Sequence, residues 1–385
     1  MHVNEIVLMI SLSIVLLISP FISNKFKFPI AVVEILLGVL LGNLGFVNIY
    51  NEYFKLLAEG GFLFLMLLAG MEVNLKDLLK IKKSIFKKTF FFLGLLYLLS
   101  FWSATLFGYG IIYVIIFSLI SVGLLLSIQQ EIGKTNWLSL ALTVGIIGEL
   151  VSILMLTLIS GYIKYGFSQK LLINIGVLIM FLVFMGFLFA MSRTLFWWFP
   201  KLKHYLMPNT DKYYQDVRIA FSLFFIMIAV LLYLKMDAVL GAFIVGVFLK
   251  TFFDHNYKLE HKLAPFGFGF LITIFFVYVG SSINLKSFDF VMLKEVACLS
   301  VIMILVRIIS SFVFFKELKF KNSVLFGLSL SMPLTLLIAT ATIAKDYHYI
   351  SNKEYIVLVV TSVVEVVVVM FGVKFINKIQ FQKKG

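Results

Sequence analysis

Residues 136–160 contain the sequence Trp137-Leu-Ser-Leu-Ala-Leu-Thr-Val-Gly-Ile-Ile-Gly-Glu149-Leu-Val-Ser-Ile-Leu154, in which a single carboxylate interrupts a predominantly apolar run. The run is long enough to cross a bilayer as one helix. Insertion scales place the cost of a charged side chain at the bilayer centre at roughly 2.5 to 3.5 kcal/mol, so such a residue needs a partner, a water-filled cavity or a function. Glu149 is therefore the first candidate for a functional site.

Apolar runs recur along the whole chain, which has 385 residues, 62% of them hydrophobic and 14% charged. An ordinary soluble domain is about 25% charged, so the composition predicts an all-α polytopic membrane protein with about 13 transmembrane helices. No segment is long enough for a soluble domain, and residues 1–385 are interpreted as a single membrane transport domain without a soluble regulatory domain. The expected spans are 4–20, 29–45, 56–75, 89–107, 111–128, 136–160, 170–194, 216–234, 237–252, 263–280, 291–315, 322–344 and 354–376.

The loops between these spans differ in charge. Of the 33 cationic side chains, 24 fall on one side of the membrane and 8 on the other. The positive-inside rule then predicts an extracellular N-terminus and a cytoplasmic C-terminus in the cell (inner) membrane. The same rule explains the formal net charge of +14, so no nucleic-acid partner is expected.

The sequence offers little support for catalysis. It contains no nucleotide-binding or hydrolytic motif and no pair of histidines at metal-ligand spacing. Cys298 is the only cysteine, which leaves neither an internal disulfide nor a cysteine metal cluster. We therefore expect no enzymatic activity, no cofactor and no resident metal.

A short motif recurs seven spans apart. Gly70-Met-Glu-Val-Asn-Leu-Lys76 closes the third span, and Gly280-Ser-Ser-Ile-Asn-Leu-Lys286 closes the tenth. Because seven is odd, two copies related in this way have opposite orientations in the membrane, as in many secondary transporters. The pattern predicts inverted repeats over about residues 4–160 and 216–376, although chance similarity between apolar segments is the alternative.

Three further charged residues lie inside expected spans. Arg307 is the only cation deep in a span, and its guanidinium needs a buried acceptor, for which Glu149 and Glu365 are the candidates. A purely structural ion pair is the alternative to a functional one. Glu34 lies nearer the cytoplasmic end of its span, where a structural or gating role and simple extension of the side chain to the surface are both open.

Two spans contain signals for an interrupted helix. In the twelfth, Pro333 lies between the hydroxyls of Ser331 and Thr335, which can bond backbone groups freed by a break. In the fifth, Ser121 and Gly123 fall close together without a proline. A kinked continuous helix is the alternative in the twelfth span and the favoured interpretation in the fifth. If both helices are discontinuous, their facing ends would surround an ion near the middle of the membrane.

The chain resembles the monovalent cation:proton antiporter family, whose sodium/hydrogen exchanger domain also forms the membrane part of glutathione-gated potassium efflux proteins. The resemblance covers nearly the whole chain. It is carried by Glu34-Ile-Leu-Leu-Gly38, Leu56-Leu-Ala-Glu-Gly60, Leu67-Leu-Ala-Gly-Met-Glu-Val-Asn-Leu75, Leu240-Gly-Ala-Phe243 with Gly246, Phe275-Phe-Val277 with Gly280, and Arg307.

The resemblance implies a secondary antiporter in which an acidic residue on the sixth helix carries the ion and the proton. Glu149 occupies that position. The resemblance also implies that Arg307 matches a basic residue of the eleventh helix and that the protein is a homodimer. Relatives usually carry Asp after Asn, Asp or Gln where this chain has Gly148-Glu149, and Thr followed by Asp or Ser and then Pro where it has Ile120-Ser121-Val122.

The leading hypothesis is exchange of protons for sodium or potassium by alternating access. Its ion and proton site would consist of Glu149, Ser121 and Arg307, with Glu365, Glu34, Ser331 and Thr335 as accessory residues. A single carboxylate at the site makes one-for-one electroneutral exchange the simplest stoichiometry. The alternatives are a ligand-gated potassium efflux pathway with a separate regulatory subunit, and a degenerate antiporter that acts as a membrane scaffold or sensor.

Overall fold

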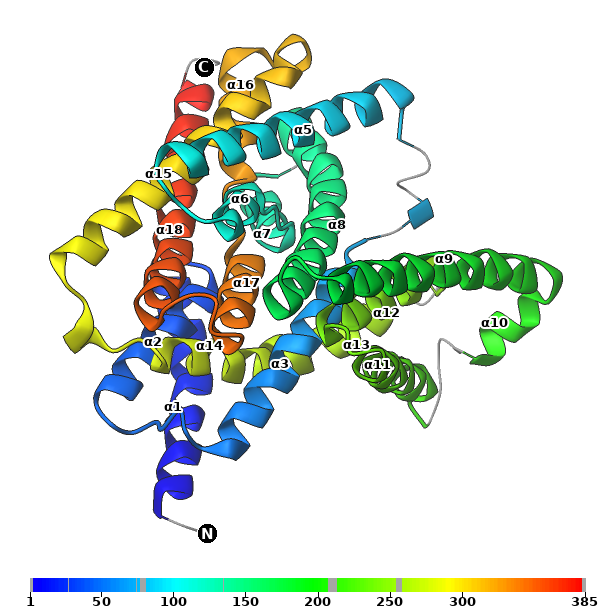
Figure 1. Ribbon diagram of the computed structural model, residues 1–385, viewed down its shortest axis with the longest axis horizontal. Coiled ribbons are helices and arrows are strands. Elements are labelled where there is room, and N and C mark those ends of the chain that lie inside the picture. Colours follow the sequence, from blue (N-terminus) through cyan, green and yellow to red (C-terminus); the bar gives the residue numbers. More distant parts are fainter. Residues whose placement is uncertain are drawn as a thin grey trace. The chain divides into compact units, whose positions relative to one another are not determined.

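The computed structural model describes residues 3–26, 28–73, 75–76, 81–133, 135–206, 213–253 and 258–382, and these ranges contain helices and no strand (Figure 1). Asn74, in the first copy of the repeated motif, lies outside them. In chain order the helices are α1 Val3–Phe26, α2 Ile30–Asn43, α3 Glu52–Met71, α5 Lys83–Leu106, α6 Ile111–Ser118, α7 Gly123–Ile132, α8 Asn136–Tyr165, α9 Gln169–Trp198, α10 Pro200–Leu206, α11 Gln215–Tyr233, α12 Ala238–Phe252, α13 Lys258–Phe266, the π-helix η1 Gly267–Leu271, α14 Ile272–Ser281, η2 Leu285–Ser287, α15 Phe290–Ser311, η3 Phe312–Phe314, α16 Phe315–Ser329, α17 Leu334–Asp346 and α18 Asn352–Gln382.

The length and composition of these elements confirm a polytopic membrane protein. Among the described residues, nine helical stretches are long and apolar enough to cross a bilayer, and three shorter apolar helices accompany them. The expected number of about thirteen spans stays a prediction. The stretch Phe290–Ser329 joins the eleventh expected span to part of the twelfth, and other apolar helices, such as Ile111–Leu125, are shorter than a full crossing.

The chain forms two compact units. One combines Met1–Phe21, Glu34–Leu79 and Thr157–Ser282, and the other combines Ile22–Val33, Lys80–Leu156 and Ile283–Gly385. The second unit thus gathers the expected spans four to six and eleven to thirteen, which are seven positions apart. The inverted repeat itself stays a prediction.

Glycines bring the backbones of the first unit close together. A Cβ atom on Gly70 of α3 would lie 2.1 Å from the Phe243 carbonyl oxygen of α12, and one on Gly246 would lie 2.1 Å from the Leu67 carbonyl oxygen. Helices inside a membrane gain their association energy from van der Waals packing and not from exclusion of water, so small residues at crossings matter. Gly70 and Gly246 are also among the residues that carry the family resemblance, and this close crossing gives a physical reason for glycine at both positions.

The second unit contains two expected spans whose helices are interrupted. In it, α5 packs on α6, while α15 packs on α16 and α18, and α17 also packs on α18 (Figure 1). The chain leaves helical conformation between Ser118 and Gly123 and again between Ser329 and Leu334. Both expected breaks are therefore present in the structure, including the one without a proline.

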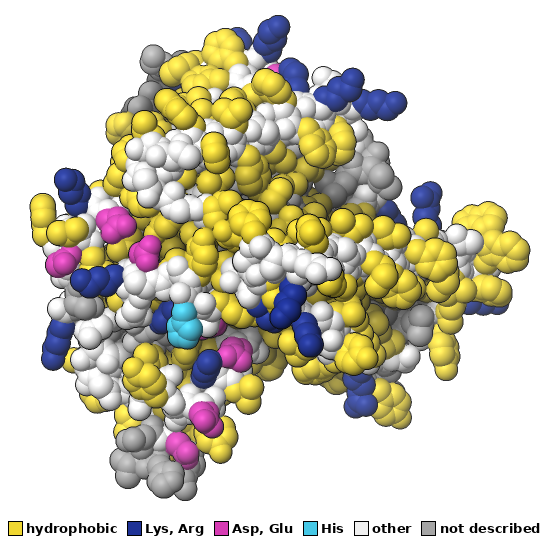
Figure 2. All heavy atoms as spheres, in the orientation of Figure 1, with side chains coloured by type: hydrophobic (Ala, Val, Ile, Leu, Met, Phe, Trp, Pro, Cys, Tyr) yellow, Lys and Arg dark blue, Asp and Glu magenta, His cyan; other side chains and the backbone are white. Residues whose placement is uncertain are grey.

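Much of the surface is apolar, as lipid contact requires. Figure 2 shows hydrophobic side chains across the visible face, with charged side chains scattered between them. On α9, Met180 is 64% exposed and Phe187 is 62% exposed, whereas Leu178 and Phe181 are buried. Such a helix, with most of its apolar side chains outward, is suited to a lipid environment and not to water.

Candidate ion-binding site

Local sequence explains the break between α16 and α17. Pro333 lacks an amide hydrogen, so the helix loses a donor there, and α17 restarts with a bond from the Leu337 amide to the Pro333 carbonyl, 2.8 Å long. The hydroxyls of Ser329 and Ser331 donate to carbonyls of the preceding turn, those of Phe326 and Gly327. Ser331 is thus used in capping the broken helix, and its side chain bonds neither Glu149 nor Ser121.

The break between α6 and α7 has a different origin. Leu119 adopts an extended conformation, with φ of −58° and ψ of 134°, and no proline imposes it. The backbone groups that it frees are instead bonded by side chains of other helices. Nη2 of Arg307 donates to the Leu119 carbonyl at 2.6 Å, and the Ile120 amide donates to Oγ of Ser152 at 3.0 Å. Tertiary contacts therefore hold this break open.

The two breaks meet at Ser121. Its hydroxyl lies 3.1 Å from Oε1 of Glu149 on α8 and 3.2 Å from the hydroxyl of Thr335 on α17. A hydroxyl has one hydrogen to donate, so when Ser121 donates to Glu149, the Thr335 hydroxyl donates to Ser121. In this chain of hydrogen bonds the Ser121 hydroxyl contacts the carboxylate directly, and Thr335 is linked to it through Ser121.

Glu149 is 1% exposed, and its Oε2 atom has no hydrogen-bond partner within the described part of the chain. The Val122 backbone amide also interacts with this carboxyl group. Gly148 precedes Glu149 and leaves room for Ile120, because a Cβ atom at Gly148 would lie 2.6 Å from Cδ1 of Ile120. No cationic side chain pairs with Glu149 in the described part of the chain, and a buried carboxylate without a counter-charge is costly, so Glu149 is suited to hold a proton or a cation.

Arg307 of α15 pairs with Glu365 of α18. Nη1 of Arg307 lies 3.5 Å from Oε1 of Glu365, and both side chains are fully buried. The same nitrogen donates to the Met303 carbonyl of its own helix at 2.8 Å. Of the two counter-charges that the sequence left open, the structure selects Glu365 and not Glu149. Arg307 reaches the site through the backbone, at Leu119.

The remaining predicted site residue lies elsewhere. Glu34 of α2 belongs to the other compact unit, where it is 2% exposed and its Oε1 lies 2.8 Å from the hydroxyl of Thr273. That hydroxyl also lies 2.9 Å from the Phe268 carbonyl in η1. The side chain therefore does not extend to the surface, which was one of the two possibilities in the sequence.

Ser152 is the residue that sequence reasoning missed. It follows Glu149 by three positions, so both side chains lie on one face of α8. This spacing is the only signal in the sequence, and it is weak, because a serine in a membrane helix usually bonds a carbonyl of its own helix.

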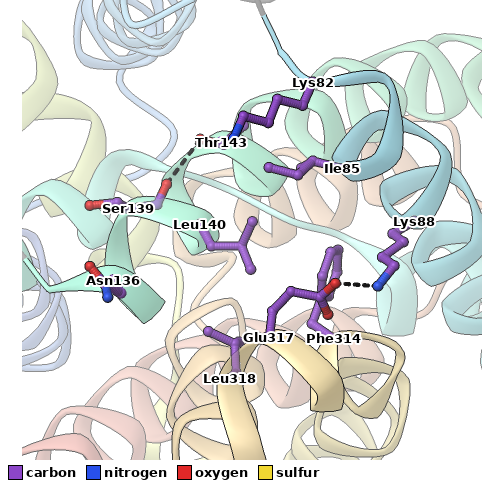
Figure 3. A pocket seen from close by; sticks show the side chains of 10 residues that line it. All are labelled: Lys82, Ile85, Lys88, Asn136, Ser139, Leu140, Thr143, Phe314, Glu317 and Leu318. Atoms are coloured by element: carbon purple, nitrogen blue, oxygen red, sulfur yellow. Dashed lines mark hydrogen bonds and ion pairs between the residues drawn. The ribbon is translucent and has the colours of Figure 1, made fainter.

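A cavity of about 540 Å³ opens in the same unit beside the beginning of α8 (Figure 3). Asn136, Ser139 and Thr143 line one side, and Lys88 forms an ion pair with Glu317 on another. The lining does not include Glu149. The hydroxyl of Thr143 donates to the Ser139 carbonyl, so the polar side chains on this wall partly satisfy their own helix.

Comparison with known proteins gives a consistent result. The family model described as "Sodium/hydrogen exchanger, transmembrane" matches residues 11–378. The chain is 28% identical over 382 residues to the putative Na⁺/H⁺ antiporter YjbQ of Bacillus subtilis (strain 168), an alignment that covers 91% of this chain and 60% of the relative. It is also 28% identical over 400 residues to the probable Na⁺/H⁺ antiporter 3 of Methanocaldococcus jannaschii, with 98% of each chain covered.

The fold is shared with a solved structure. The sodium proton antiporter MjNhaP1 from Methanocaldococcus jannaschii superimposes with a TM-score of 0.68, covering 97% of this chain and 99% of that one. Sequence identity in this superposition is 15%, so the likeness concerns the arrangement of helices. The chain spans 60% of the Bacillus subtilis relative but 98% of the one from Methanocaldococcus jannaschii.

Proposed function

Because the chain belongs to the sodium/hydrogen exchanger family, we propose that it is a secondary active antiporter that exchanges protons for monovalent cations by alternating access. Its relatives from Bacillus subtilis and Methanocaldococcus jannaschii are named as a putative and a probable Na⁺/H⁺ antiporter, which supports this proposal. In this proposal the chain is a transporter and not an enzyme, and the cation and the proton are its substrates.

The observation that carries the proposal is the position of Glu149 at the meeting point of two broken helices. Its carboxyl group is buried, one of its oxygens accepts from Ser121, and the other has no partner among the described residues. A proton or a cation bound there removes the cost of burying the negative charge. A single carboxylate that has bound a proton has little affinity left for a cation. Competition for Glu149 would couple the two fluxes.

We propose that Ser121 and Thr335 supply hydroxyl oxygens to the cation beside Glu149. Hard monovalent cations prefer oxygen ligands, and both hydroxyls can rotate to present a lone pair when a cation replaces the proton. Arg307 and Glu365 compensate one another at 3.5 Å, so of the two buried carboxylates in this compact unit, Glu149 and Glu365, it is Glu149 that has no cationic partner among the described residues and is left to change its charge. This arrangement favours one-for-one electroneutral exchange of sodium or potassium.

The decisive experiment measures collapse of an imposed pH gradient in everted membrane vesicles on addition of sodium, potassium or lithium salts. Wild type should collapse the gradient with at least one cation, and Glu149→Gln should not. Glu59→Gln is the matched control, because Glu59 lies on an exposed helical face beside Lys55 and loses its charge in the same way. Equal activity of wild type and Glu149→Gln would reject Glu149 as the carrier.

The same proposal extends to assembly and placement. We propose a homodimer in the cell (inner) membrane, a single membrane transport domain, and a cytoplasmic C-terminus. The outward apolar side chains of α9, among them Met180 and Phe187, offer a surface that lipid or a second copy would cover. An antiporter moves cations only in exchange for protons, whereas a ligand-gated potassium pathway would conduct cations without proton exchange. A membrane scaffold would show no cation-dependent proton flux.

A further inference from the structure

One peptide group at the α6–α7 break is held at both ends. Its carbonyl belongs to Leu119 and accepts from Arg307 at 2.6 Å, and its amide belongs to Ile120 and donates to Ser152 at 3.0 Å. Arg307 is fully buried and Ser152 is 1% exposed. Both polar groups of this peptide are therefore satisfied without water, by side chains from α15 and α8.

The residue that follows this peptide is Ser121, whose hydroxyl contacts Glu149 at 3.1 Å and Thr335 at 3.2 Å. Rotation of the peptide plane would redirect the Ser121 side chain, because the two are connected through the backbone of Ile120. Glu149 and Ser152 are three residues apart on α8, so one helix face carries both the carboxylate and the anchor of the break. The residue next to Ser121 and the carboxylate that Ser121 contacts are thus both bonded to or carried by the same helix, α8.

We propose that Ser152 is a positioning residue for the carrier site. Its hydroxyl oxygen accepts a hydrogen bond from the Ile120 amide, while Arg307 bonds the carbonyl at the other side of the same peptide. This contact sets the direction in which Ser121 presents its oxygen to the ion at Glu149. The inference rests on the proposed function for its effect on transport, whereas the hydrogen bond itself is a property of the fold. Ser152 acts through Ser121 and does not touch the ion.

Packing alone does not account for this contact. The side chain of Ile120 is already accommodated against Gly148, where a Cβ atom would lie 2.6 Å from Cδ1 of Ile120. The amide of Ile120 is a separate requirement, because an N–H group buried in a membrane interior needs an acceptor. A residue of the same shape as threonine but without the hydroxyl would fill the space and leave that amide unpaired.

The test compares Ser152→Thr with Ser152→Val, which have nearly the same shape and differ in the hydroxyl. Cation-dependent proton flux is measured in everted vesicles over a range of sodium and potassium concentrations. Loss of one buried hydrogen bond should raise the half-saturating cation concentration in Ser152→Val about fivefold above that of Ser152→Thr, with the maximal rate less affected. Ser139→Ala is the control on the same helix, since its hydroxyl donates only to the Thr135 carbonyl, at 2.9 Å.

A second readout does not depend on transport. Hydrogen–deuterium exchange of the purified protein, followed by mass spectrometry of peptides covering residues 116–124, should be faster in Ser152→Val than in Ser152→Thr. If the two variants agree in both half-saturation and exchange, Ser152 does not position the site. If wild type shows no cation-dependent flux, the proposed function fails. Faster exchange in Ser152→Val than in Ser152→Thr would then still support the hydrogen bond from the Ile120 amide to Ser152 as a restraint on the break. Equal exchange in the two variants would overturn it.

Discussion

At the scale of single residues, isolated charges in apolar runs were predictable, and the counter-charge of Arg307 was narrowed to two candidates without a choice between them. Glu149 and Arg307 stand out in the sequence because each is costly in lipid. Which carboxylate neutralises Arg307 depends on how α15 packs against α18, and no local pattern encodes this. The role of Ser152 was not predicted for a related reason. Its hydroxyl accepts a hydrogen bond from the Ile120 amide only because the chain is not helical between α6 and α7.

The Arg307–Glu365 pair gives the first test at this scale. Replacing Glu365 by Leu leaves a buried guanidinium without its counter-charge, and we expect a loss of about 3–5 kcal/mol in the free energy of unfolding. Thermal unfolding in detergent, followed by tryptophan fluorescence, measures it. A double variant, Arg307→Met with Glu365→Leu, should recover part of this loss, because no charge is then left unpaired.

Glu317→Leu is the control for that experiment. Glu317 also pairs with a cation, Lys88, but its side chain is 40% exposed, so its removal should change stability by about 1 kcal/mol or less. The interpretation of Arg307 and Glu365 as a coupled buried pair would be wrong if Glu365→Leu and Glu317→Leu had the same effect.

At the scale of elements, composition predicted the helices better than their interruptions. Pro333 marks the second break directly, because a proline removes a donor from the helix. The first break has only small and hydroxyl residues such as Ser121 and Gly123 as signals, and these favoured a kinked continuous helix, which the structure does not show. The backbone there is held open by Arg307 and Ser152, which are distant in the chain.

Close helix crossings provide the test at the element scale. We expect Gly246→Ala to destabilise the protein by about 1–3 kcal/mol, because a methyl group there meets the Leu67 carbonyl at 2.1 Å and forces α3 and α12 apart. Gly186→Ala in α9 is the matched control, since no atom lies within 4 Å of a Cβ atom at that position. Alanine forms helix better than glycine, so Gly186→Ala should be neutral or slightly stabilising. Equal melting temperatures for the two variants would contradict the role assigned to the crossing.

At the scale of the whole molecule, the seven-span offset links topology to internal symmetry. Each of the segments 80–156 and 283–385 contributes three of the expected spans to one compact unit. An odd offset requires that corresponding helices run in opposite directions across the membrane. The beginning of α5 and the beginning of α15 should then face opposite compartments, the first in the cytoplasm according to the distribution of Lys and Arg.

Single cysteines can decide this. Cys298 is the only native thiol, so Cys298→Ser gives a background into which Lys83→Cys and Lys294→Cys are placed separately, both at exposed positions. A membrane-impermeant maleimide should label Lys294→Cys in right-side-out vesicles and Lys83→Cys in everted ones. Permeabilised vesicles, in which both thiols should react, control for accessibility. Labelling of both positions from the same side would exclude an inverted relation between α5 and α15. Labelling of Lys83→Cys in right-side-out vesicles and of Lys294→Cys in everted ones would keep the inversion but place the Lys-rich loops outside. That result would contradict the orientation inferred from the distribution of Lys and Arg.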